Sequence, residues 1–410
     1  MISFVSHLEG AIDGTRLEAG KLHGLHQGRP IWVRYDLESV KRSVAPSDLI
    51  ERAPSLWRYR ELLPLPMDAQ PVTLGEGMTP LLDAPRLANE LGLEKLWIKD
   101  ESQLPTGSFK SRGMTMAISM AKHLGVKRVA LPTAGNAGGA AAAYAARAGM
   151  ECYVFMPEDT PIINQMEAHL FGAKTFKVNG LINDCGKIVR EGAEHFGWFD
   201  LSTLKEPYRI EGKKTMGLEL AEQLNWRLPD VILYPTGGGT GLIGMWKAFQ
   251  ELRELGWLNM DKMPKLISCQ SDGCAPIVTA FQDGKRFADL FPNAHTIASG
   301  LRVPVAVGDF MILDSIRQSR GTAICGNESR IGEWTRRSMS ATGISICPET
   351  AVCFDALEKL IESKFVSPTD EVVVFNTGAV QKYIEALPFE LPRLDRHAAA
   401  SELWSRIEQG

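Results

Sequence analysis

Three short stretches of the sequence combine residue types that could do chemistry. The first, PTGSFKSRG at residues 105–113, places Lys110 after a Pro/Gly turn and an aromatic residue, at the head of an apolar, methionine-rich helix. Partial burial beside a second cation, here Arg112, would lower the pKa of Lys110 and make its amine a usable nucleophile or base. Because a lysine on an exposed helix is usually only a solvated charge, this stretch indicates chemistry only in combination with others.

The second stretch is PTGGGTG at residues 235–241, between a predicted strand and a predicted helix. Residues without a Cβ let backbone N–H groups turn inward, and the following helix adds its positive end, so we expect a phosphate cradle rather than a plain tight turn. A G-x-G-x-x-G pattern at 239–244 leaves dinucleotide binding open. However, the acidic residue expected about 20 positions further on is poorly placed, since the nearest candidate is Asp272. No Gly-Lys-Ser/Thr follows, so a P-loop is excluded.

The third stretch is PTAGNAGG at residues 132–139, again between a strand and a helix. Its small residues let a flat ligand or a carboxylate approach the backbone, and Asn136 adds an amide. Alternatively, Asn136 only caps the helix, and Gly138 and Gly139 only allow close packing. An amine for a Schiff base, an amide for a ring oxygen and a phosphate anchor are together what a phosphorylated aldehyde cofactor needs.

The elements around these stretches follow an α/β pattern. From about residue 95, short apolar runs end in Gly, Pro or Asn and are followed by helical stretches, which is typical of βαβ units and a mainly parallel sheet. Open sheets of this kind bind ligands at the carboxyl ends of their strands, where the second and third stretches fall. The predicted strands are 95–98, 128–131, 151–156, 173–178, 230–234, 265–270 and 371–375, and the predicted helices are 137–148, 161–171, 183–196, 242–255 and 276–282.

The predicted fold class is therefore α/β, with two open, mainly parallel sheets and a cofactor in the cleft between two domains. A length of 410 residues fits two or three domains. The irregular stretch 201–214 is expected to cross between the two α/β domains. The predicted division is an N-terminal extension at 1–70, a large cofactor-binding domain at 71–105 plus 205–390, a smaller domain at 106–204 and a helical tail at 391–410.

Composition limits the partners. The chain has 45 Lys and Arg against 49 Asp and Glu, a net charge of −4, so there is no general cationic field for nucleic acid or anionic lipid. Seven cysteines without a C-x-x-C pair fit a reducing cytosol. The N-terminus has no signal-peptide pattern and no apolar run is long enough to span a bilayer. We therefore expect a cytoplasmic protein with no nucleic acid and no membrane partner.

Five blocks of the sequence resemble the fold-type II, or tryptophan-synthase-β-like, pyridoxal-phosphate enzymes, and within them the threonine synthases. The blocks are VTLGEGMTPLL, PTGSFKSRGMT, AGNAGGAAAAYAARAGM, PYRIEGKKT and VVVFNTG, which occur in the order of that group and cover roughly residues 70 to 385. The resemblance implies pyridoxal 5'-phosphate as the cofactor, an amino-acid substrate and a homodimer. It also implies a lyase that converts O-phosphohomoserine and water to threonine and phosphate by γ-elimination and β-hydration.

The resemblance also assigns roles to residues. Lys110 would carry the Schiff base and move protons, and Asn136 would bond the 3'-oxygen of the ring. Thr377 matches the hydroxyl residue that faces the pyridine nitrogen, and Arg209 matches the residue that reaches the phosphate of O-phosphohomoserine. The cofactor phosphate would be held by Gly237, Gly238, Gly239 and Thr240, and the substrate carboxylate by the Thr133, Ala134, Gly135, Asn136 and Ala137 loop.

The sequence departs from the threonine synthase pattern in several places. Ser111 stands where an aspartate is usual, and the glycine-only GGGTG loop and the T-A-G-N-A loop are more like those of threonine/serine dehydratases. A dehydratase, or another β-eliminating lyase on a hydroxy amino acid, is therefore the alternative function. A nicotinamide-dependent oxidoreductase and a non-catalytic cofactor-binding protein are the readings from other classes.

Two further features are left open by the sequence. Lys213 and Lys214 favour an anionic leaving group, although both could lie on a solvated helix face. The N-terminal segment is similar to a cysteine-bearing ribbon of relatives, but Gly10 and Asp13 stand where cysteines would be. We expect His23 and His26 to be two surface histidines rather than half of a metal site, and predict no bound metal.

Overall fold

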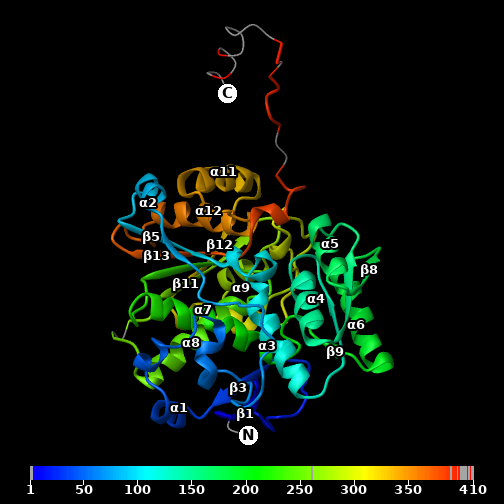
Figure 1. Cartoon of the computed structure of the whole chain (residues 1–410). Helices are drawn as coiled ribbons and strands as arrows, with labels where there is room; N and C mark the ends of the chain where they lie inside the picture. Colours follow the sequence, from blue (N-terminus) through cyan, green and yellow to red (C-terminus); the bar gives the residue numbers. More distant parts are fainter. Residues whose placement is uncertain are drawn as a thin grey trace.

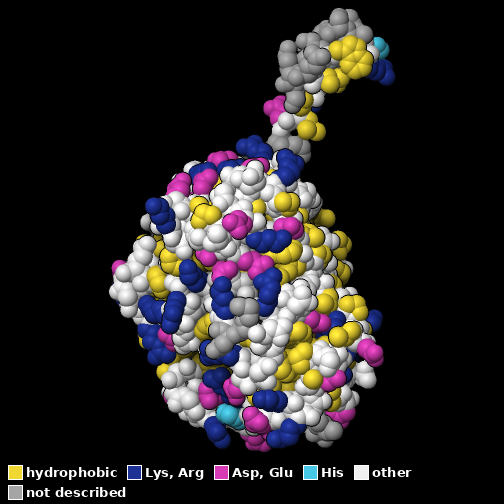
Figure 2. Space-filling model, turned by 90° about the vertical axis from the view of Figure 1, so that its left-hand side faces the viewer, with side chains coloured by type: hydrophobic (Ala, Val, Ile, Leu, Met, Phe, Trp, Pro, Cys, Tyr) yellow, Lys and Arg dark blue, Asp and Glu magenta, His cyan; other side chains and the backbone are white. Residues whose placement is uncertain are grey.

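The computed structural model describes residues 3–259, 262–387, 390–394, 396–397, 404 and 407. Their strands form three sheets, of which the N-terminal one lies below the other two in Figure 1. On the face shown in Figure 2, basic and acidic side chains are interspersed, in keeping with the nearly balanced charge of the chain. None of the helices within the described residues combines the length and hydropathy needed to span a membrane.

The largest sheet has six strands in the order β12-β11-β10-β13-β5-β4. All neighbours are parallel except β4, which pairs antiparallel with β5 at one edge. The strands are β4 (Leu81–Asp83), β5 (Lys95–Asp100), β10 (Val231–Pro235), β11 (Lys265–Ser271), β12 (Thr322–Gly326) and β13 (Glu371–Asn376).

Helices cover both faces of this sheet, which explains the continuous apolar runs in its central strands. Alternate residues of β13 face opposite ways: Val372 and Val374 join one apolar core, and Val373 and Phe375 join the other. The first core includes α2 (Pro85–Leu91), α11 (Ile331–Thr342) and α12 (Pro348–Glu362), and the second includes α7 (Tyr208–Gln223), α8 (Thr240–Leu255), α9 (Pro276–Gln282) and α10 (Asp309–Gln318).

The second sheet has four parallel strands in the order β8-β7-β6-β9. Val129 and Leu131 pack with the small and methionine-rich side chains of one helix layer, whereas Ala130 packs with α6 on the other face. The strands are β6 (Arg128–Pro132), β7 (Glu151–Pro157), β8 (Lys174–Val178) and β9 (Phe199–Asp200), and the helices are α3 (Lys110–His123), α4 (Ala137–Ala148), α5 (Ile162–Leu170) and α6 (Ile182–Phe196).

The N-terminal segment forms a small antiparallel sheet of β1 (Val5–Gly10), β2 (Arg16–Leu17) and β3 (Ile31–Tyr35), followed by α1 (Leu37–Ser43). Leu8 and Val33 are buried in the same core as α3. The Tyr35 hydroxyl donates a hydrogen bond of 2.7 Å to Glu211 in α7. These contacts fix the N-terminal sheet to helices α3 and α7.

The predicted α/β class with two mainly parallel sheets is confirmed. α4 and α9 have the predicted bounds, but the stretch 201–214 is not irregular in its second half, because α7 begins at Tyr208. The sequence analysis missed β12 and the N-terminal strands, which are short or lie at sheet edges. The helix predicted at 391–410 falls mostly outside the described residues.

Candidate active site

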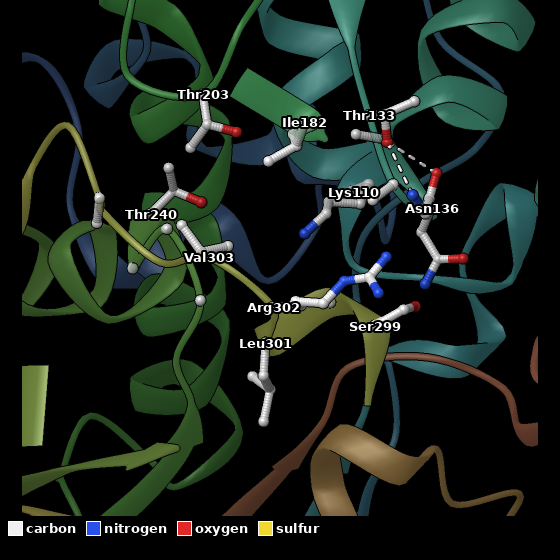
Figure 3. A pocket seen from close by; sticks show the side chains of 18 of the residues that line it. Lys110, Thr133, Asn136, Ile182, Thr203, Thr240, Ser299, Leu301, Arg302 and Val303 are labelled. Carbon is white, nitrogen blue, oxygen red and sulfur yellow. Dashed lines mark hydrogen bonds between the residues drawn. The ribbon is translucent and has the colours of Figure 1, made fainter. Parts of the chain in front are cut away.

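A cavity of about 380 Å³ lies where chain segments from the two larger sheets meet. It opens at the carboxyl ends of β6, β10 and β13 and at the N-terminus of α3. Figure 3 shows the Lys110 amine near its middle, with Thr240 on one side and Thr133 and Asn136 on the other. The structure therefore brings together the three stretches that the sequence singled out.

The glycine loop joins β10 to α8. Gly239 has a φ of +72°, a left-handed conformation that favours glycine, and a Cβ at Gly237 would collide with the carbonyl oxygen of Gly300. Thr240 is the first residue of α8, so unpaired backbone N–H groups and the positive end of the helix lie at the cavity. This arrangement can hold a phosphate.

The asparagine loop joins β6 to α4 and is folded on itself. The Thr133 hydroxyl accepts a hydrogen bond of 3.1 Å from the Gly135 amide and donates one of 2.9 Å to the Gly135 carbonyl (Figure 3). In the described structure the Asn136 side chain makes no capping hydrogen bond, so the alternative of a simple helix cap is wrong. Its Nδ2 instead donates a hydrogen bond of 2.9 Å to the Tyr383 hydroxyl. Ala134, Gly135 and Ala137 also line the cavity.

Lys110 is the first residue of α3, and its Nζ lies 4.1 Å from the centre of the Phe109 ring. Burial, and next the positive charge of Arg209, lower the pKa of Lys110 to about 8, while Glu349 opposes the shift. The predicted partner was wrong: Arg112 does not supply this charge, because its guanidinium is bound between Glu101 and Glu219. The pKa of Lys110 is lowered, as predicted. Burial is the main cause, and the cation that adds to it is Arg209, which lies 99 residues further along the chain.

Arg209 lines the same cavity from the start of α7 and is 2% exposed. Its Nη1 donates a hydrogen bond of 2.7 Å to the Leu201 carbonyl, and its Nε is buried without a hydrogen-bond partner among the described residues. Burial lowers its pKa, against the opposing charge of Glu206. A buried guanidinium with an unused donor is suited to bind an anion.

The two lysines that follow Arg209 in α7 differ. Lys214 forms ion pairs of 2.8 Å with both Glu211 and Glu251, away from the cavity lining. Lys213 donates to the Phe109 carbonyl, and its Nζ lies 3.8 Å from the Phe109 ring centre. Both are buried, so the reading of a solvated helix face is wrong. Neither lysine lines the cavity, so anion binding in the cavity depends on Arg209 instead.

Thr377 lies directly after β13, at the floor of the cavity. Its Oγ1 is 3.6 Å from the Cys347 Sγ, and its amide donates to the Thr350 hydroxyl at 3.2 Å. Burial raises the pKa of the Cys347 thiol to about 12, so the thiol beside the Thr377 hydroxyl is neutral. This is a suitable environment for an unprotonated ring nitrogen.

The sequence analysis missed several residues of the cavity. Ser299 and Arg302 come from a loop after β11 and α9, and Glu349 from the first turn of α12. Figure 3 shows the Arg302 side chain between Lys110 and Ser299, and its guanidinium pairs with Asp159 at 2.8 Å. A proline directly before Glu349, at a helix start, was the one local signal for these residues.

The cavity fits a phosphorylated aldehyde cofactor. Besides Arg209 Nε, the buried polar atoms of cavity-lining residues that lack a partner within the described part of the chain are Asn136 Oδ1, Tyr234 Oη, Ser299 Oγ and Glu349 Oε2. Buried polar groups are normally hydrogen-bonded, so these atoms indicate a bound molecule. The glycine loop would hold its phosphate and Lys110 its aldehyde. No cluster of three metal-ligating side chains occurs in the described ranges, and His26 instead pairs with Asp13 at 3.1 Å.

Comparison with known protein families decides the identity of this cofactor. A family model described as pyridoxal-phosphate dependent enzyme matches residues 72–378. The chain belongs to this family. The match includes every cavity residue that the sequence analysis named, from Lys110 to Thr377.

Several relatives of this pyridoxal-phosphate enzyme carry the name threonine synthase. That of Methanocaldococcus jannaschii is 36% identical over 347 residues, which are 84% of this chain and 84% of the relative. That of Methanosarcina acetivorans is 34% identical over 85% of both chains. That of Synechocystis is 37% identical over 77% of this chain and 79% of the relative.

Solved structures with the same fold include maize serine racemase, with a TM-score of 0.64, 20% identity and coverage of 81% of this chain and 92% of that chain. Diaminopropionate ammonia lyase of Escherichia coli has a TM-score of 0.65, 20% identity and coverage of 77% and 88%. At this identity the likeness concerns the fold alone.

Proposed function

We propose that this enzyme is a threonine synthase that converts O-phosphohomoserine and water to threonine and inorganic phosphate. The observation that carries the proposal is Arg209, a buried cation with an unused donor in the same cavity as Lys110. It offers a site for an anion in addition to the cradle of the glycine loop. The relatives named threonine synthase, which are 34–37% identical over most of the chain, support the same substrate.

In this proposal Lys110 holds the cofactor and moves protons. Bound pyridoxal phosphate supplies an electron sink for the negative charge that develops on substrate carbon. With a pKa of about 8, the Lys110 amine is partly neutral near neutral pH, so its Nζ can accept a proton from the substrate and return it. The neutral Thr377 hydroxyl, beside the neutral Cys347 thiol, faces the ring nitrogen, which favours elimination over reactions that need a protonated ring.

The other assigned residues bind and orient. The helix start at Thr133 to Ala137 receives the substrate carboxylate, and Gly237 to Thr240 hold the cofactor phosphate. Asn136 bonds the ring 3'-oxygen. Arg209 binds the substrate phosphate and stabilises the charge that it gains when the Cγ–O bond breaks and the bonding electrons leave with phosphate.

The test measures products. The purified holoenzyme is incubated with O-phosphohomoserine, and phosphate and threonine are quantified; ammonia and a 2-oxo acid from threonine or serine would instead indicate the dehydratase. Arg209→Met should raise the KM for O-phosphohomoserine about 10- to 100-fold, since a charged hydrogen bond is lost. It should leave the binding of L-serine, which has no phosphate, nearly unchanged. Equal effects on both ligands would contradict the role of Arg209.

We also propose a domain division and a setting for the enzyme. Residues 71–105 and 205–390 form the large domain, 106–204 the smaller one and 1–70 an extension, and the cavity lies between the two domains.

The enzyme is a cytoplasmic homodimer; seven free thiols support a reducing compartment. An exposed apolar row on α5, Ile162, Met166 and Leu170, supports a subunit interface. Light scattering on wild type and Met166→Glu tests the dimer.

A further inference from the structure

Tyr383 lies against the cavity wall between two polar residues of the site. It follows β13 and the short helical turn Val380–Lys382, and it is 3% exposed. Its hydroxyl accepts the hydrogen bond of 2.9 Å from Asn136 Nδ2. A tyrosine hydroxyl that accepts one hydrogen bond still has its own proton to donate.

Glu349 supplies the negative charge that acts most strongly on this hydroxyl. This side chain is 4% exposed, and its Oε1 accepts a hydrogen bond of 2.8 Å from the Gly300 amide. Burial and the negative charge of Glu349 raise the pKa of Tyr383, so the hydroxyl keeps its proton. Over the residues that the structure describes, the Oε2 atom of Glu349 is buried without a hydrogen-bond partner.

The backbone before Tyr383 is fixed on the loop that carries Lys110. The Phe109 amide donates to the Thr377 carbonyl and the Ala379 amide to the Gly107 carbonyl, each at 3.0 Å. Lys382 Nζ donates to the Thr106 carbonyl at 2.8 Å and pairs with Glu167 at 2.6 Å. Tyr383 is therefore held at a set distance from both Lys110 and Asn136.

These contacts determine where the Asn136 amide points. One of the two Nδ2 protons goes to Tyr383, which leaves the second for another acceptor. The Oδ1 atom has no partner in the described ranges. Without Tyr383 the amide could rotate about its last torsion, whose energy profile is broad. With Tyr383 in place, both free amide atoms have fixed directions in the cavity lining.

We propose that Tyr383 is a positioning residue that orients Asn136 toward the ring of the bound cofactor. The proposal rests on the site assigned under the proposed function and adds Tyr383 to the residues that this site requires. Asn136 is the residue that touches the cofactor, and Tyr383 acts through it. Since the tyrosine acts before any substrate binds, its effect is measurable on the cofactor alone.

The first experiment compares Tyr383→Phe with Tyr144→Phe. Both tyrosines are nearly fully buried, but the Tyr144 hydroxyl donates to Glu76 at 2.6 Å, away from the residues that line the cavity. We titrate the cofactor-free proteins with pyridoxal phosphate and record the absorption spectrum of the product. Tyr383→Phe should weaken cofactor binding about three- to tenfold and shift absorption from the visible toward the near-ultraviolet band, while Tyr144→Phe should match wild type. Identical spectra and affinities for all three proteins would overturn the proposal.

The second experiment asks whether Tyr383 acts through Asn136. In an Asn136→Ala background, the additional change Tyr383→Phe should have no further effect on cofactor affinity or spectrum. Independent effects that multiply would mean that Tyr383 has only a structural role, and would contradict the proposal that it acts through Asn136.

These readouts contain no substrate, so they separate this proposal from the proposed function. If wild type binds the cofactor and Tyr383→Phe shifts its spectrum, the positioning role of Tyr383 is supported even if no phosphate is released from O-phosphohomoserine. If phosphate is released but Tyr383→Phe behaves like wild type, the positioning role is wrong and the threonine synthase activity is supported.

Discussion

Helices α3 and α7 carry two groups of buried charges that are arranged in opposite ways. In the first group Arg112 is bound between Glu101 and Glu219, and Lys99 pairs with Glu219 at 3.2 Å. In the second group Lys110 and Arg209 line the cavity, Lys213 lies against the Phe109 ring, and the charges that act on Lys213 are mostly positive. Both groups are buried, and only Ser111 separates Lys110 from Arg112 in the sequence.

The pKa shifts follow the pairing. The carboxylates around Arg112 raise its pKa well above its usual value, and Arg112 and Lys99 lower the pKa of Glu219. In the second group, burial and neighbouring cations lower the pKa of Lys110, and more strongly that of Lys213. Paired charges hold the two helices together, while unpaired cations remain available for a ligand or for proton transfer. Four predictions test this contrast.

The largest effect is expected for Lys110→Ala. This change removes both the amine that holds the cofactor and the group that moves protons, so kcat should fall at least about a thousandfold. The visible absorption of the bound cofactor, and its loss on borohydride reduction, report the attachment directly. Lys122→Ala, an exposed position near the end of α3, is the matched control. A Lys110→Ala enzyme that still released phosphate from O-phosphohomoserine would contradict the mechanism.

The second prediction breaks the paired group. Arg112→Met leaves Glu101 and Glu219 buried without their main counter-charge, so the free energy of unfolding should fall by about 3–5 kcal/mol. The exposed pair of Arg128 and Glu151 provides the control, since Arg128→Met should change stability by less than about 1 kcal/mol. Urea unfolding of the cofactor-free proteins measures both. Similar losses for the two variants would show that burial does not set the contribution of these charges.

The third prediction sharpens the comparison with two adjacent lysines. Lys214→Met removes a paired cation and should lower the free energy of unfolding by about 3 kcal/mol, although Lys247 still pairs with Glu211 and Glu251. Burial lowers the pKa of Lys213 well below its usual value, so its charged form is less stable in the folded protein than in the unfolded chain, and Lys213→Met should leave stability equal or higher.

The sign of the pH dependence provides the check on Lys213. Because the pKa of Lys213 is lower in the folded protein, the unfolded chain binds more protons between that lowered pKa and the usual lysine pKa, and wild-type stability should rise with pH over this range. Lys213→Met should reduce this slope by up to about 1.4 kcal/mol per pH unit, the contribution of one proton. An unchanged slope would mean that Lys213 is charged in the folded protein.

The contrast also explains what the sequence could predict. Glycine runs, an asparagine and a lysine at predicted helix starts are local signals, so the Lys110, Asn136 and Gly237 loops were found. Pairing is not local: Arg112 meets Glu219 across 107 residues, and Asn136 meets Tyr383 across 247. For this reason Arg112 was wrongly taken as the neighbour of Lys110, and Glu349 and Tyr383 were missed. Short edge strands such as β12 gave too weak a pattern to predict.

The smallest effect concerns the pH at which the Lys110 amine becomes reactive toward the cofactor. Only the neutral amine of Lys110 attacks an aldehyde, so the rate at which cofactor-free protein gains visible absorption with pyridoxal phosphate should rise with pH, with a midpoint near the pKa of about 8. Arg209→Met removes a charge that lowers this pKa, so the midpoint should move to higher pH. Glu349→Gln removes a charge that raises it, so the midpoint should move to lower pH. If both variants moved the midpoint in the same direction, cofactor binding rather than the charges around Lys110 would set the pH dependence.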